Sequence, residues 1–136
     1  MTNAKEYLNG IKYKRKQLDR FKKRRADLHL DVSFGGIDYS ADRVQTTPDN
    51  KLEKAMIRLS ERMEYLDERI AALSVEIDDR LSSIESVDNN TYRDILFKRY
   101  SQYKSFEEIS VDMGYDYNYV CNLHGDALKE LSQLLN

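Results

Sequence analysis

A heptad repeat of apolar residues between positions 52 and 84 is the feature of this sequence that most limits the possible folds. Apolar residues recur there in steps of four and three, and charged residues fill most of the positions between them. The repeat comprises Leu52, Met56, Leu59, Met63, Leu66, Ile70, Leu73 and Ile77, continued by Leu81 and Ile84. This spacing places the apolar side chains along one side of a helix. The segment is therefore predicted to be a long helix that buries this side against another helix.

The nearest partner for this repeat is a second long helix, predicted over residues 4–32. One face of it carries Ala4, Leu8, Ile11, Leu18, Leu28 and Val32, and Arg15 and Arg25 interrupt that face. Residues 33–49 contain Gly35, Gly36 and Pro48 and are predicted to form a loop. An antiparallel helical hairpin is the simplest closure, although pairing between chains would also cover the repeat.

The composition agrees with an all-α chain. Its 136 residues include one proline and no tryptophan, and 34% are charged, which favours long helices with a large polar surface. Cys121 is the only cysteine, so no disulfide can form within the chain. We find no apolar run of roughly 20 residues and no signal peptide, and we expect a cytoplasmic protein with no membrane contact.

Basic residues are concentrated at the start of the chain. The first thirty residues hold ten lysines and arginines but only three acidic residues, whereas the chain as a whole has a net charge of −2. Such a basic segment is typical of nucleic-acid contact, although a solvated helix face or packing on an acidic helix would explain it equally well. The candidate phosphate contacts are Lys22, Lys23, Arg24 and Arg25.

The heptad pattern breaks at residues 88–91, and a different pattern follows. We place a domain boundary there, with a helical hairpin or oligomerisation region over residues 1–88 and a second domain over residues 89–136. In the second domain Ser105 and Glu108 are spaced as in a capping box. Gly114 is predicted to end that short helix with a positive φ, and Asp116 to cap a longer one. A short helix, a glycine turn and a long helix match the helix-turn-helix plan.

The last third of the chain resembles the region-four DNA-binding domain of bacterial sigma factors. Residue types recur at the family's offsets at Tyr92, Arg93, Ile95, Leu96, Arg99, Tyr100, Ser105, Phe106, Glu107, Glu108, Ile109, Met113, Gly114, Val120, Leu123, Ala127, Leu128 and Leu131. The resemblance implies double-stranded DNA as partner, read by the residues that open the second helix of the motif. Carried over by position, these are Tyr117, Asn118, Cys121 and Asn122, and Lys104 and Ser105 complete the candidate DNA contacts.

The chain departs from the sigma family in charge. No lysine or arginine lies between Lys104 and Lys129, where the family has basic residues, and from Asp88 onward five basic residues face eight acidic ones. Counterion release from this domain alone would be weak. A dimer or higher oligomer, the basic first helix or host RNA polymerase would have to contribute.

The whole chain is similar to small phage regulators of the ArpU and RinA type, associated with late-gene transcription. Residues 4–8 and 42–48 carry this similarity. It implies a transcription regulator acting in a bacterial host. Two alternatives remain open: an adaptor that docks on RNA polymerase without reading bases, and an oligomeric DNA-packaging protein of the small-terminase type.

No catalytic chemistry is indicated by the sequence. We find neither a nucleophile–base constellation nor a phosphate-cradling glycine loop, so we do not expect an enzyme. Cys121 and His124 are spaced like some metal ligand pairs, but His29 is the only other histidine and there is no second cysteine. We therefore expect no metal site and no cofactor.

Overall fold

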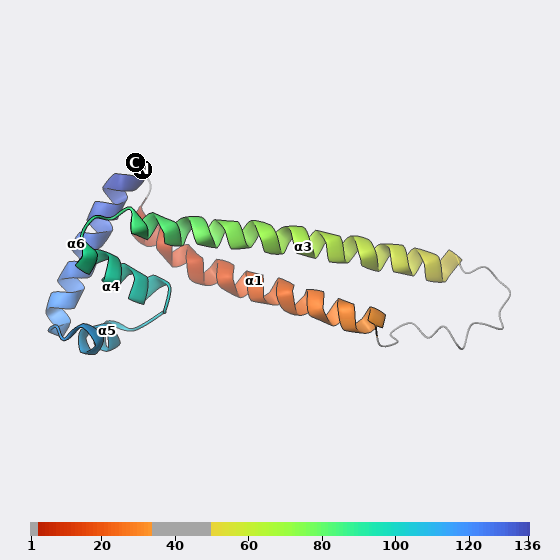
Figure 1. Ribbon diagram of the computed structural model, residues 1–136, viewed down its shortest axis with the longest axis horizontal. Coiled ribbons are helices and arrows are strands. Elements are labelled where there is room, and N and C mark those ends of the chain that lie inside the picture. The colour runs from red at the N-terminus through yellow and green to blue at the C-terminus, as the bar shows by residue number, and fades with distance from the viewer. Residues whose placement is uncertain (1–2, 34–49) are drawn as a thin grey trace. The chain divides into compact units, whose positions relative to one another are not determined.

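The computed structural model describes residues 3–33 and 50–136, with the side chains of residues 31–33 left out. These residues form helices and no strand, which confirms the all-α prediction. The helices are α1 (Ala4–Ser33), α3 (Asn50–Glu85), α4 (Asn90–Tyr100), α5 (Phe106–Met113) and α6 (Tyr117–Leu135) (Figure 1). The predicted loop lies, apart from Ser33, outside the described residues.

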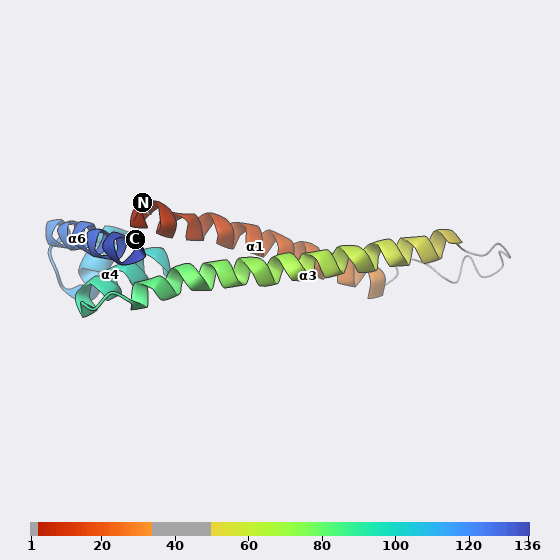
Figure 2. The same ribbon diagram turned by 90° about the horizontal axis from the view of Figure 1, so that it is seen from above.

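Two compact units make up the chain. The terminal unit comprises Met1–Arg15 and Val75–Asn136, and the central unit comprises Lys16–Ser74. This division differs from a boundary at residues 88–89, because the first turns of α1 belong with the C-terminal helices. The Ala4 amide donates a hydrogen bond to Ser132 Oγ at 3.1 Å. Both views accordingly show the start of α1 beside the end of α6 (Figures 1 and 2).

In the central unit, α1 and α3 lie side by side in opposite directions. The apolar faces meet through Leu18, Leu28, Leu66 and Leu73, all of which are buried. Arg25 interrupts the apolar face of α1, and its side chain reaches over to α3. There Nε lies 2.9 Å from Asp67 Oδ1 and Nη1 lies 3.3 Å from Met63 Sδ. The long side chain thus fills an apolar position while its charge is paired at the edge.

The two helices also pair within the terminal unit. Leu8, Ile11, Ile77 and Ile84 are buried there. Arg80 Nη1 donates to the Tyr7 carbonyl at 2.7 Å, and Gly10 leaves room for this guanidinium because a Cβ at that position would collide with it. Across both units, the remaining members of the heptad repeat are half-buried. The predicted long helix and its preference for burying one side are therefore confirmed.

A small apolar core holds α4, α5 and α6 together. Ile95, Ile109 and Val120 contribute one fully buried side chain from each helix, and Phe106, Met113 and Leu123 pack around them. The pattern break at residues 88–91 corresponds to the start of α4, where the Asn89 side chain accepts hydrogen bonds from the Thr91 and Tyr92 amides. This core fixes α5 and α6 relative to each other.

Candidate nucleic-acid interface

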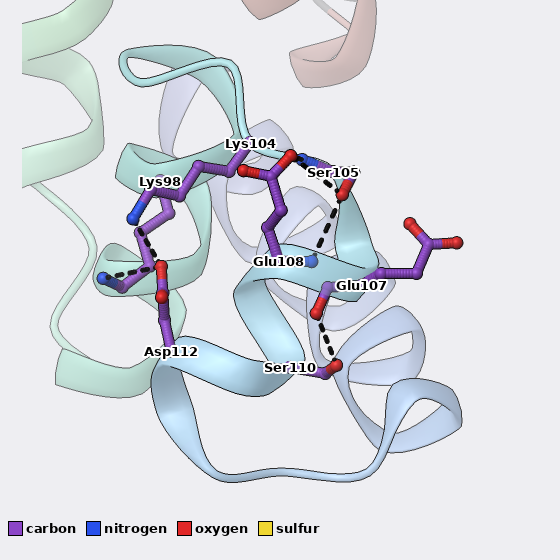
Figure 3. A network of polar contacts seen from close by, with 7 residues as sticks. All are labelled: Lys98, Lys104, Ser105, Glu107, Glu108, Ser110 and Asp112. Carbon is purple, nitrogen blue, oxygen red and sulfur yellow. Dashed lines mark hydrogen bonds and ion pairs between the residues drawn. The ribbon is translucent and has the colours of Figure 1, made fainter.

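The start of α5 is held by the predicted capping box (Figure 3). Ser105 Oγ accepts a hydrogen bond from the Glu108 amide at 3.2 Å, and the Ser105 amide donates to Glu108 Oε1 at 3.3 Å. Two backbone donors that the helix leaves free are thereby satisfied. The hydroxyl of Ser105, one of the predicted DNA contacts, is consequently engaged within the protein.

Lys104, another predicted DNA contact, also has a partner within the molecule. Its ammonium donates to Asp112 on α5, and Lys98 Nζ lies 3.8 Å from the same carboxylate oxygen (Figure 3). The hydrogen bond from Lys104, together with both positive charges, lowers the pKa of the Asp112 carboxyl. Any phosphate contact by Lys104 would have to compete with Asp112.

The turn between α5 and α6 has the predicted chemistry. Gly114 has a φ of +69° and ψ of 30°, a left-handed conformation that glycine adopts without a Cβ penalty. The Tyr115 amide donates to the Ser110 carbonyl at 3.0 Å and so closes α5. Asp116 then caps α6 by accepting a hydrogen bond from the Asn118 amide at 3.1 Å. The sequence thus determines both where α5 stops and where α6 starts.

The structure brings four predicted DNA contacts together on the opening turns of α6. Tyr117, Asn118 and Asn122 are exposed, and Cys121 is half-buried. Cys121, one turn further along α6, interacts with the Tyr117 hydroxyl and raises the pKa of the tyrosine. The opposite side of α6 is buried, and its core residues are Val120, His124, Ala127 and Leu131. Asn118 and Asn122 are also one turn apart, so their amide groups project from the same exposed side.

The predicted phosphate contacts on α1 divide into two kinds. Lys22, Lys23 and Arg24 are exposed, as a surface for phosphate requires. Arg25 instead pairs with Asp67, so its guanidinium is part of the packing between α1 and α3. All four belong to the central unit, whereas α6 belongs to the terminal unit.

Sequence reasoning missed a buried polar pair. Tyr100 and His124 are both almost fully buried, and the tyrosine hydroxyl lies 2.9 Å from His124 Nε2. Burial first, and then the charges of Arg99 and Lys5, lower the pKa of His124 to about 4. The helical spacing from Val120 to Ala127 already places His124 on the buried side. Among the side chains of residues 3–30 and 50–136, no group of three or more histidine, cysteine or acidic residues is placed to hold a metal ion.

Comparisons with known proteins gave no match among protein families, curated proteins or solved structures. None of the described helices is long and apolar enough to cross a membrane.

Proposed function

We propose that this chain is a DNA-binding transcription regulator that reads base pairs with α6. The observation that carries the proposal is the exposure of Asn118 and Asn122 on the opening turns of a well-anchored helix. An asparagine side chain can form a bidentate contact with adenine in the major groove, which is wide enough to admit a helix. Together with the resemblances of the sequence, this favours a phage or prophage regulator acting in the bacterial cytoplasm.

The contacts that hold α6 in place are suited to reading base pairs. Base reading requires side chains held on a firm element, because a small displacement costs affinity. The residues that open α6 are fixed from one side by the Asp116 cap and from the other by the buried Val120. Gly114 sets the angle at which α5 leads into α6. These features correspond to the short helix, turn and long helix of the helix-turn-helix plan.

Phosphate contacts must come largely from outside α6. From residue 88 onward acidic residues outnumber basic ones, and the exposed opening of α6 carries no lysine or arginine. The ten basic residues among the first thirty are the richest source of positive charge. We propose that α1, through Lys22, Lys23 and Arg24, supplies part of the electrostatic affinity. A second copy of the chain in a dimer or host RNA polymerase would supply more.

The proposal is tested by selecting binding sites from random duplex DNA with the full-length protein at low salt. Enrichment of a short motif that contains adenine, confirmed by gel shift, is the expected result. A matched selection with Asn118→Ala/Asn122→Ala should lose the motif. No enrichment and no shift at low salt would reject base reading by α6.

A second candidate function is docking on a protein, such as RNA polymerase. It is favoured by Phe97, whose side chain is 45% exposed on α4. A cavity of about 340 Å³ lies beside it, lined also by Ile84, Arg93 and Lys98 within the terminal unit. Exposed aromatic residues next to such hollows are common anchors in protein interfaces. An adaptor would bind purified polymerase through Phe97 and would show no sequence preference in the selection.

A further inference from the structure

Several cations gather around one aromatic residue in the segment between α4 and α5. Lys12 Nζ and Arg15 Cζ, both on α1, each lie 5.9 Å from the centre of the Tyr103 ring. This is close to the outer limit of a cation–π contact. Arg99 approaches the same segment, because its Nη1 donates to the Lys104 carbonyl at 3.0 Å. All of these residues belong to the terminal unit.

The backbone at Tyr103 is unusual. Its φ is +57°, and it is the one residue other than glycine in the described parts of the chain with a positive φ. Glycine or asparagine is common where a helix ends in this way, whereas a bulky residue is disfavoured. A strained residue at such a position points to a function for its side chain. Here the ring of Tyr103 is the surface on which Lys12 and Arg15 gather.

A small cavity opens at this place. It measures about 130 Å³ and is lined by Leu8, Asn9, Lys12, Arg99, Tyr100 and Tyr103. Among the described residues that line it, two are cationic, none is acidic, and Asn9 adds an amide. A space of about 10–15 Å³ by the same measure already holds one water molecule, so this cavity is large enough for a small tetrahedral anion.

We propose that this cavity, with Lys12, Arg99 and the neighbouring Arg15, binds a phosphate group. A guanidinium and an ammonium are the groups that bind phosphate in proteins, and Arg99 and Lys12 bring one of each to the lining of this cavity. The ligand is either a phosphodiester of a nucleic-acid backbone or the phosphate of a small molecule. The site does not depend on base reading by α6 and lies on different residues.

The test titrates the full-length protein with inorganic phosphate and, separately, with a short duplex of random sequence. Backbone amide NMR shifts locate phosphate on the protein, and fluorescence anisotropy gives the DNA affinity. The test variant is Lys12→Gln/Arg15→Gln. The control is Lys51→Gln/Lys54→Gln, which removes two exposed charges from α3. Arg99 is left intact because it also lies 4.4 Å from the Phe106 ring and helps to hold the fold.

Inorganic phosphate is expected to shift the NMR signals of the Tyr103 and Lys104 backbone amides in the wild-type protein. This measurement does not depend on whether any variant folds. The test variant should bind inorganic phosphate, the DNA duplex or both about tenfold more weakly than the control variant does. An effect on inorganic phosphate identifies a free phosphate as a ligand, and an effect on DNA alone identifies the phosphodiester.

Two results would overturn the site. One is the absence of these shifts together with equal DNA affinity of the two double variants. The other is a set of shifts elsewhere that persists unchanged in the test variant. Phosphate binding without any DNA binding would leave the site intact and reject the DNA-binding function instead, so the two failures can be told apart.

Discussion

The hydroxyl of Tyr100 on α4 and the imidazole of His124 on α6 meet at 2.9 Å inside the terminal unit. Their rings stack with centroids 5.7 Å apart, and the Phe106 ring packs on His124 in a T-shaped arrangement with centroids 4.9 Å apart. The pair links two helices through a polar contact in an otherwise apolar setting. Because the pKa of His124 is lowered to about 4, the imidazole is neutral at pH 7 and cannot be protonated in place without cost.

This pair makes the stability of the fold sensitive to acid. An unfolded histidine takes up its proton near pH 6.5, whereas the folded His124 does so only near pH 4. Between these values the unfolded state binds more protons, so the free energy of unfolding falls as the pH drops from 6.5 to 4. After allowance for solvent screening we expect a loss on the order of 1–3 kcal/mol, measured by urea denaturation at several pH values.

Two variants separate this effect from the titration of carboxylates. His124→Gln removes the buried imidazole and should flatten the dependence of stability on pH over this range. His29→Gln changes an exposed histidine on α1 and should keep the wild-type dependence. Equal pH dependence in all three proteins would show that His124 does not control acid stability.

The packing of α1 against α3 predicts a strong effect for Leu66→Ala. Leu66 is fully buried, and truncation of such a leucine costs about 2–5 kcal/mol. Val75→Ala on the same helix is the matched control, because that side chain is 59% exposed and its loss should cost less than about 1 kcal/mol. Chemical denaturation of both variants gives the comparison. A cost below about 0.5 kcal/mol for Leu66→Ala would mean that this position is not packed in solution.

Gly114 in the turn and Gly125 inside α6 predict effects of opposite sign on stability. Gly114→Ala forces a Cβ into a left-handed conformation and should destabilise the protein by about 1–2 kcal/mol. Gly125→Ala lies within α6, where the new Cβ meets nothing within 4 Å, and should stabilise it by about 0.5–1 kcal/mol. Thermal unfolding distinguishes the two. Equal effects would show that Gly114 does not keep its positive φ in solution.

Local signals in the sequence were enough to predict most helix ends in the C-terminal part. Ser105 with Glu108, Gly114 and Asp116 each act through hydrogen bonds or backbone angles within a few residues, so their roles follow from spacing alone. The heptad repeat likewise predicts the buried side of α3, because helical periodicity alone decides it.

Contacts between distant residues could not be predicted in this way. The neighbours of Tyr103 are Lys12 and Arg15, which lie 91 and 88 positions earlier in the chain, and no local pattern in the sequence predicts a tyrosine with a positive φ. Arg25 was predicted to face phosphate but pairs with Asp67, since a charge in an apolar repeat can be matched from the facing helix. Pairings of this kind depend on the register of two helices.

We also predict self-association through α3. In the central unit Ile57 and Tyr65 are exposed on α3, on the side of the helix that faces away from the heptad repeat. A second copy could cover this apolar surface, and sedimentation equilibrium should show a dimer. Ile57→Glu should shift the dimer toward monomer while the protein stays folded. A strict monomer at high micromolar concentration would contradict the prediction, whereas a large ring seen by light scattering would favour the packaging alternative.

The last prediction concerns how DNA is read. Asn118→Ala and Asn122→Ala each remove an exposed amide from the opening turns of α6. If these amides contact bases, each change should weaken binding to the selected site by about 1–3 kcal/mol and relax preference at one position. Binding to unrelated DNA should hardly change, because phosphate contacts carry it. Anisotropy titrations on both duplexes measure the difference.

Neutralising Lys22, Lys23 and Arg24 provides the contrasting case. These cations are exposed on α1, and contacts with phosphate carry no information about the base sequence. Their loss should weaken binding to every sequence alike and reduce the slope of log affinity against log salt by about one unit per contact. The two sets of variants therefore leave different signatures in the same titrations. If both asparagine variants retain full affinity and full sequence preference, α6 is not the reading element, and docking on a protein becomes the better explanation.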